Sequence, residues 1–180
     1  QLVWAFRFKM PAVMDGVCWQ LRDLQEPAVS MVVANGNLCA ESPDGKNVVL
    51  QSCEAGRDYG VKVVVDLPTK TADIQIDGQV KAKATRFCRP VESIDFVLIK
   101  TGEVATGELF LGPVNIHKGY AVCETFVTSA VGKLPAEWTA EGAASVESFE
   151  CATKPDIFSL KLSGSKEKPA SVSRGFQVIP

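Results

Sequence analysis

The sequence predicts an all-β protein, an antiparallel β-sandwich or jelly roll stabilised by disulfides. Three observations predict it: short segments rich in β-branched and aromatic residues, Gly- and Pro-containing turns between them, and six widely spaced cysteines. The 180 residues are 46% hydrophobic and 22% charged, which is the usual composition of a chain that buries a core. We therefore expect a single β-rich unit over residues 1–180.

Turn-forming dipeptides separate the expected strands. Asp-Gly occurs at Asp15-Gly16, Asp44-Gly45 and Asp77-Gly78, and Asn35-Gly36 has the same chemistry. These pairs favour two-residue hairpin turns, because both central residues of such turns need a positive φ. Four hairpin turns are therefore predicted.

The segments around these turns have the composition of strands. In residues 79–84, valine and alanine alternate with Lys81 and Lys83, which is the period-two pattern of a strand with one solvated face. Residues 94–99 are apolar on both faces and are expected to be buried on both. A short helix is allowed only at residues 17–26. The other expected strands are residues 29–34, 48–52, 61–67, 72–76, 108–114, 120–128, 145–151, 158–162 and 172–178.

An internal boundary near residues 118–122 is the alternative to a single unit. On that interpretation residues 1–118 form a β-sandwich, and residues 119–180 form a further β module or its first half.

The cysteines are expected to form three disulfides, because their number is even, their spacing is wide and no C-x-x-C pair suggests zinc. Six cysteines allow about 15 pairings, so the connectivity stays open. A Cys39–Cys53 bridge is favoured, since the Asp44-Gly45 turn would bring their strands together. Disulfides form in oxidising compartments, so a secreted or cell-surface location is expected. The six are Cys18, Cys39, Cys53, Cys88, Cys123 and Cys151.

Charge and hydropathy argue against two kinds of partner. The formal net charge is -2, which offers no basic excess for nucleic acid. No apolar run reaches the roughly 18 residues needed to span a bilayer. The chain starts at Gln1 with neither Met nor an apolar leader, which predicts a mature form or an excised fragment.

Two stretches resemble carbohydrate-binding modules of the galactose-binding-like jelly-roll type. In residues 91–116 (VESIDFVLIKTGEVATGELFLGPVNI) a strand, a Gly-containing polar turn and a closing strand follow one another, although Gly112-Pro113 replaces the family's acidic residue. Residues 134–178 contain Leu134-Pro-Ala-Glu-Trp138 and Phe158-Ser-Leu-Lys-Leu162, which are similar to the opening of such modules. Residues 134–178, which resemble the beginning of such a module, come after residues 91–116, which resemble its end. The resemblance implies a jelly roll that binds carbohydrate without catalysis.

The expected ligand-binding residues are Tyr59, Arg57, Asp58 and Trp19. Tyr59 is predicted to present an exposed ring to a sugar, with Arg57 and Asp58 hydrogen-bonding the hydroxyls. The alternative is that Arg57 and Asp58 are polar residues of a solvated loop and bind no ligand. Trp19 follows Cys18, which is also typical of a tryptophan packed on a disulfide in a sandwich core.

No catalytic residue, metal site or cofactor is predicted, because the chain lacks a G-x-S-x-G elbow, an H-E-x-x-H helix and a phosphate-binding P-loop. The lone histidine, His117, is expected at the surface. A structural calcium ion is the alternative, with Asp73, Asp77 and Asp95 as ligands.

Three functions follow in order of preference. The first is an extracellular non-catalytic module that recognises carbohydrate. The second is a structural or adhesive surface domain that binds an extracellular protein, or joins a larger assembly through an exposed strand edge. The third is a hydrolase or lyase acting on polysaccharide.

Overall fold

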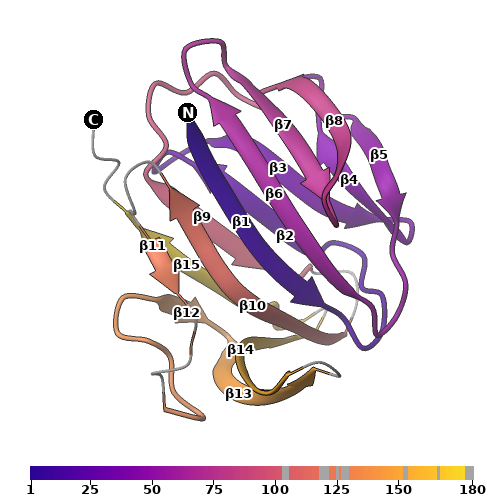
Figure 1. Ribbon diagram of the computed structural model, residues 1–180, viewed down its shortest axis with the longest axis vertical. Coiled ribbons are helices and arrows are strands. Elements are labelled where there is room, and N and C mark those ends of the chain that lie inside the picture. The colour runs from indigo at the N-terminus through magenta and orange to yellow at the C-terminus, as the bar shows by residue number, and fades with distance from the viewer. Residues whose placement is uncertain are drawn as a thin grey trace.

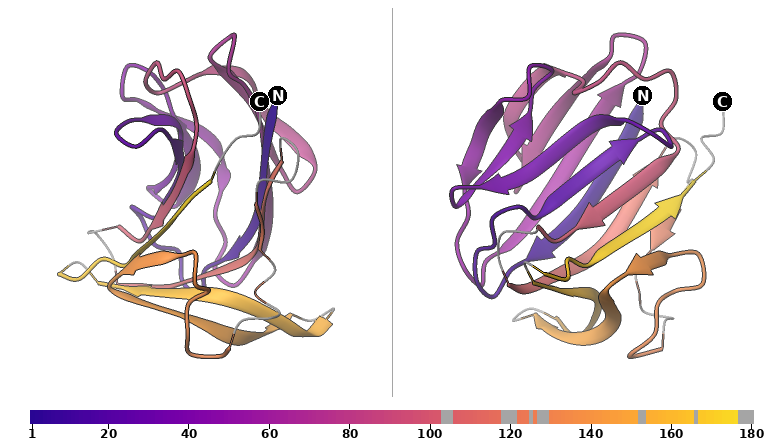
Figure 2. Two further views of the ribbon diagram at one scale, coloured as in Figure 1. Left: turned by 90° about the vertical axis from the view of Figure 1, so that its left-hand side faces the viewer. Right: turned by 180° about the vertical axis from the view of Figure 1, so that it is seen from behind.

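The computed structural model describes residues 1–102, 106–117, 122–124, 126, 130–151, 154–165 and 167–176, without the side chains of 122–124, 148–151 and 154–158. Two antiparallel sheets pack face to face around one core (Figure 1 and Figure 2), so the predicted sandwich is confirmed. The described residues contain no helix, and hence none that is long and apolar enough to cross a membrane.

Each sheet is built from strands that are distant in sequence. In spatial order, sheet A contains β13 (Ala143–Cys151), β14 (Lys154–Gly164), β10 (Gly107–His117), β1 (Leu2–Lys9), β6 (Asp58–Asp66), β7 (Thr71–Ile76) and β8 (Gln79–Arg86), and β11 (Val122–Glu124) pairs with β10. Sheet B contains β12 (Thr139–Glu141), β15 (Ser171–Gly175), β9 (Phe96–Lys100), β2 (Cys18–Arg22), β3 (Pro27–Ala34), β4 (Asn37–Glu41) and β5 (Asn47–Ser52).

Strand β1 lies at the centre of sheet A, between β10 and β6. Its sequence LVWAFRFK alternates, so that every second side chain is buried. The inward rings of Phe6 and Phe8 contact Trp19 of β2, with centroids 6.0 and 4.5 Å apart. Because Trp19 belongs to sheet B, these ring contacts join the two sheets. Sequence analysis did not predict β1, although its alternation is clear.

The short helix allowed at residues 17–26 is wrong, because this segment contains β2. Val17, Trp19 and Leu21 are buried on one face. On the other face Cys18 is buried, and Gln20 and Arg22 are half-buried. This is the period-two pattern of a strand. Strands β4 and β12 were also not predicted.

Two of the four predicted hairpin turns have the expected backbone. Asn35-Gly36 has φ values of 51° and 72°, and Asp77-Gly78 has 52° and 78°, as primed turns require. At Asp44-Gly45 only the glycine has a positive φ, of 76°. Asp15-Gly16 lies between β1 and β2, which belong to different sheets, so the hairpin predicted there is wrong.

The strands after residue 122 add to both sheets. β14 pairs with β10, and β15 pairs with β9, so residues on both sides of the predicted boundary at 118–122 share the same sheets. Figure 2 (left) shows that β13 and β14 run across the end of the sandwich and project beyond the outer side of β1.

The four cysteines whose side chains the structure describes, Cys18, Cys39, Cys53 and Cys88, carry free thiols. The expected disulfides are therefore not seen at these positions, and the favoured Cys39–Cys53 bridge is absent. The register explains this, because Cys39 lies opposite Val49, while Cys53 follows Ser52, which lies opposite Asn37. The side chains of Cys123 and Cys151 lie outside the described part of the chain.

We expect Trp19→Ala to lower the free energy of unfolding by about 3–5 kcal/mol, because it removes a buried ring that joins the two sheets. The control is Leu24→Ala, since Leu24 is 79% exposed and should change stability by less than about 0.5 kcal/mol. Urea unfolding monitored by circular dichroism measures both. Equal unfolding midpoints for the two variants would contradict this role of Trp19.

Candidate functional site

The outward side chains of the central strands of sheet A form the candidate site, which we call the outer face of sheet A. The pairing of β10, β1, β6 and β7 aligns these side chains in rows across the strands. The rows are His117, Val3, Val64 and Asp73; Asn115, Ala5, Lys62 and Gln75; Gly112, Arg7 and Gly60; and Phe110, Lys9 and Asp58.

A bidentate ion pair lies in this face. Arg7 Nη2 is 2.8 Å from Asp58 Oδ2, and Arg7 Nε donates to Oδ1 at 3.2 Å. The two side chains are 58% and 29% exposed, so the pair is fixed in orientation yet accessible. Gly112 allows this arrangement, because a Cβ there would lie only 3.1 Å from the Arg7 Cβ. No side chain of β10 therefore stands directly beside Arg7 at position 112.

A second charged cluster surrounds Arg57, at the turn that precedes β6. Its guanidinium contacts Glu54 Oε1 at 2.8 Å and Asp77 Oδ2 at 2.9 Å. Asp77 Oδ1 also accepts the Gly60 N–H, at 2.8 Å. The hydrogen bond to Glu54, followed by that to Asp77, raises the pKa of Arg57. Predicted ligand residues Arg57 and Asp58 thus lie at the surface, each already paired with an oppositely charged side chain.

The prediction that Tyr59 is an exposed platform is wrong. The alternation of β6 points Tyr59 inward, where it is 1% exposed and stacks on Phe8 with centroids 5.0 Å apart. Its hydroxyl accepts the Glu54 N–H at 2.6 Å, and the Arg57 guanidinium covers the ring at 4.9 Å from the centroid. This burial raises the pKa of Tyr59. Neither Tyr59 nor the fully buried Trp19 offers a ring to a ligand.

The outer face of sheet A has little aromatic surface. Every tryptophan and tyrosine whose side chain the structure describes is buried, and on this face Phe110 is half-buried. Lys161 Nζ of β14 lies 5.7 Å from the Phe110 centroid and contacts Glu108 at 2.7 Å and Glu147 at 3.5 Å. The hydrogen bond to Glu108 is the main cause of the raised pKa of Lys161.

Sequence analysis missed Arg7, Lys62, Asn115 and Lys161 as candidate site residues. Their common signal is the alternation of β1, β6, β10 and β14, which places each of them opposite a residue of the next strand. Finding them required the pairing of the strands, which is not local in sequence.

The three aspartates expected to bind calcium do not form one site. Asp73 Oδ1 accepts the Ala84 N–H at 2.7 Å, and Asp77 is bonded to Arg57 and Gly60. Asp95 lies before β9, in the other sheet. Within the described residues, no three side chains of the metal-ligating types come together.

The described thiols are poor nucleophiles. Burial raises the pKa of Cys18, Cys53 and Cys88 to about 11 in each case, and it also raises the pKa of Cys39. A nucleophilic cysteine reacts as the thiolate, so at neutral pH these four side chains are protonated and unreactive.

Residues 22–108 match the family model described as Sialidase-like, CBM domain. The predicted resemblance to carbohydrate-binding modules is confirmed. The segment matching this module runs from the end of β2 into β10 and includes Arg57, Asp58 and Lys62. It overlaps the first of the two stretches that suggested such a module from sequence, at residues 91–108, and does not reach the second.

Solved structures with a similar arrangement include a sialidase and a variant of human galectin-16. The sialidase has a TM-score of 0.49 and 12% identity over 97% of this chain, and the chain spans only 13% of that protein. The galectin variant has a TM-score of 0.46 and 11% identity over 66% of this chain and 88% of its own. The comparison with curated proteins gives no match.

We expect the free energy of unfolding to fall as the pH rises from about 9 to 11. In this window the unfolded chain releases the thiol protons of Cys18, Cys53 and Cys88, whose ordinary pKa is 9.0, while the folded protein, with pKa values of about 11, retains them. The unfolded state therefore binds fewer protons than the folded state. The contribution of these three thiols to the free energy of unfolding is fully present below pH 9 and is lost as the pH rises toward 11. Chemical unfolding at a series of pH values measures the slope.

The matched variant is Cys18→Ala, which removes one titrating thiol and should make the slope shallower than in the wild type. Lysines and tyrosines that titrate in the same range are common to both proteins, so the difference between the two slopes isolates Cys18. Identical slopes would mean that Cys18 is not a buried free thiol.

Proposed function

We propose that this chain is an extracellular, non-catalytic carbohydrate-binding module that binds sugar on the outer face of sheet A. The observation that carries the proposal is the match of residues 22–108 to a carbohydrate-binding-module family. The composition of the outer face supports it, because polar side chains surround a centre of small residues, Ala5, Gly60 and Gly112.

The Arg7–Asp58 pair supplies the chemistry that a sugar needs. A sugar hydroxyl both donates and accepts hydrogen bonds, and the pair presents N–H donors beside carboxylate acceptors, both partly exposed. In the next row, Asn115 and Lys62 lie on either side of Ala5 and extend the polar surface. A sugar lying over Ala5 and Gly60 would be within the reach of all four polar side chains.

Hydrogen bonds rather than ring stacking would provide the affinity. No tryptophan or tyrosine among the described side chains is exposed, so this face lacks the large ring on which a pyranose could stack. Exposed polar contacts are individually weak. We therefore expect a low affinity for a single sugar and stronger binding to surfaces that display many copies.

The state of the described thiols supports a non-catalytic role. The described thiols are protonated at neutral pH, since burial raises their pKa. The secreted or cell-surface location is part of this proposal, because the glycans of polysaccharides and glycoproteins are displayed there.

A protein-binding role is the second candidate, and the strand edges favour it. β8 ends sheet A and β5 ends sheet B on one side, whereas β13 and β12 end them on the other; β5 and β8 contact each other. Val48, Val49 and Val80 on these strands are 50%, 59% and 58% exposed. A strand of an extracellular protein could pair with such an edge and cover the valines. Val49→Lys would then abolish the adhesion and leave sugar binding unchanged.

We expect Arg7→Ala to weaken sugar binding by about tenfold or more, because it removes the charge-assisted donors of the ion pair. The matched control is Lys46→Ala. Lys46 is also the cation of an exposed ion pair, with Asp44 at 2.9 Å, but it lies in the β4–β5 turn of sheet B. A glycan array identifies the ligand, and calorimetric titration with that sugar compares the wild type with both variants.

Binding that is lost in Arg7→Ala and kept in Lys46→Ala would support the assignment of the site. Equal affinities of the wild type and Arg7→Ala would place the sugar elsewhere. If the folded wild-type protein binds no glycan on the array, in either monovalent or multivalent form, the proposed function is wrong.

A further inference from the structure

Strand β5 is the last strand of sheet B and has one open edge. Within the described residues it pairs with β4 alone, and Figure 1 shows it at the border of the sandwich. The N–H and C=O groups on its other edge therefore have no strand partner. Val48 and Val49 point to opposite faces of the sheet and are 50% and 59% exposed. The edge thus combines unpaired backbone groups with exposed apolar side chains on both faces.

Two other terminal strands have features that hinder pairing with another chain. β8 carries Lys81 and Lys83, and its backbone departs from the extended form at Ala84, which has a φ of 49°. β12 has only three residues. Charges, irregular backbone and short length all protect sheet edges. β5 has six residues and no charged one, and the extra residue in its register with β4, Leu50, is anchored in the core.

The charges that flank β5 favour a second copy of this chain as the partner. Before the strand, Lys46 contacts Asp44 at 2.9 Å, and after it, Arg57 contacts Glu54 at 2.8 Å. Each flank therefore carries one exposed acid and one exposed base. Lys46 and Glu54 are equally distant from Leu50 in the sequence, so antiparallel pairing of two β5 strands about a two-fold axis at Leu50 sets each Lys46 opposite a Glu54. Parallel pairing would set Lys46 beside its own copy, and like charges in that position repel.

We propose that two copies of this chain pair antiparallel through β5, so that sheet B continues from one copy into the other. The open edges then bond to each other, and Val48 and Val49 of both copies are covered near the axis. The association is symmetric and closes at two copies. It does not depend on sugar binding, because β5 belongs to sheet B and the proposed sugar site lies on the outer face of sheet A.

The symmetry has a consequence for binding, and this consequence rests on the proposed function. The two-fold axis is perpendicular to sheet B, so it keeps each face of the sandwich on its own side. The outer faces of sheet A in both copies therefore point in the same direction. Two sugar sites that face one way can bind a single glycan-bearing surface together, and linked sites bind such a surface more tightly than either does alone.

Sedimentation velocity of the full chain over a concentration series measures the association without any ligand. The wild type should convert from monomer to dimer as its concentration rises. Val49→Lys should raise the dissociation constant by about tenfold or more, because it places two ammonium groups near the axis. The control is Val80→Lys, since Val80 is also a half-exposed valine, at 58%, but lies on β8. It should leave the constant unchanged.

A wild type that stays monomeric at about 1 mM would overturn the proposal, and that is the result expected if a strand of another protein covers this edge instead. Equal effects of Val49→Lys and Val80→Lys would also overturn it. Circular dichroism confirms that each variant is folded.

Charge exchange tests the antiparallel arrangement. Glu54→Lys should weaken the dimer by about threefold or more, because the new lysine meets Lys46 of the other copy. Adding Lys46→Glu to the same chain should restore the dimer, since each pair again joins opposite charges. A double variant as weak as Glu54→Lys alone would show that these side chains do not meet, and the arrangement would be wrong.

Glycan binding by the monomeric variant separates this proposal from the sugar site. Each copy keeps its own site, so Val49→Lys should bind a single sugar as the wild type does and bind a glycan-coated surface about tenfold or more weakly. Equal binding of the two proteins to the coated surface would contradict the shared direction of the sites. If no glycan is bound at all, the proposed function fails, while the sedimentation result for the dimer is unaffected.

Discussion

The contacts of Trp19 with Phe6 and Phe8 are the constraint on which the rest of this structure depends. They join a central strand of sheet A to a central strand of sheet B, and they fix which side of β1 faces the core. A one-residue shift of β1 would send Arg7 inward and expose the two phenylalanines. Burying an unpaired guanidinium is too costly for that. Because side chains alternate along β1, burying its phenylalanines in the core places Arg7 on the polar outer face of sheet A.

Much of the fold could be predicted from local sequence patterns, whereas the candidate site could not. The strand before Asn35-Gly36 and the two strands around Asp77-Gly78 follow from composition and turn chemistry, and the structure contains them as β3, β7 and β8. The partners of β1, in contrast, are β6 and β10, some 50 and 100 residues away, and nothing near β1 specifies them. Tyr59 illustrates the consequence. Its Arg-Asp-Tyr-Gly motif suggests an exposed turn, but the strand already begins at Asp58, so alternation buries the ring.

The number of cysteines alone could not predict whether they are paired. Six cysteines suggest disulfides, but a bridge requires two Cβ atoms about 4 Å apart. In β4 and β5 the irregular register between Leu38 and Cys39 sets Cys39 opposite Val49 and leaves Cys53 beyond the end of β5. A turn at Asp44-Gly45 does connect the two strands, although only Gly45 has the predicted positive φ, and the register between the strands was not predicted. Burial of these thiols, rather than a covalent bond, is what the described structure shows.

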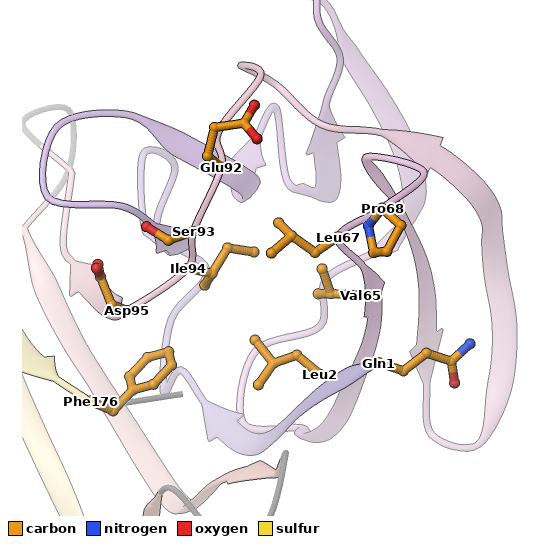
Figure 3. Close-up of a pocket in the computed structure, with 10 residues that line it drawn as sticks. All are labelled: Gln1, Leu2, Val65, Leu67, Pro68, Glu92, Ser93, Ile94, Asp95 and Phe176. Atoms are coloured by element: carbon orange, nitrogen blue, oxygen red, sulfur yellow. The ribbon is translucent and has the colours of Figure 1, made fainter. Parts of the chain in front are cut away.

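The side chains that β1 and β6 direct inward differ in size between the two ends of the strand pair, and this difference explains a pocket lined by Leu2, Val65 and Ile94 (Figure 3). At one end Phe8 of β1 lies opposite Tyr59 of β6, and both rings pack in the core. At the other end Leu2 lies opposite Val65, and these smaller side chains leave the space beside Ile94 unfilled. This space is a surface pocket and not a void in the core, since the exposed residues Pro68, Glu92 and Ser93 form part of its lining.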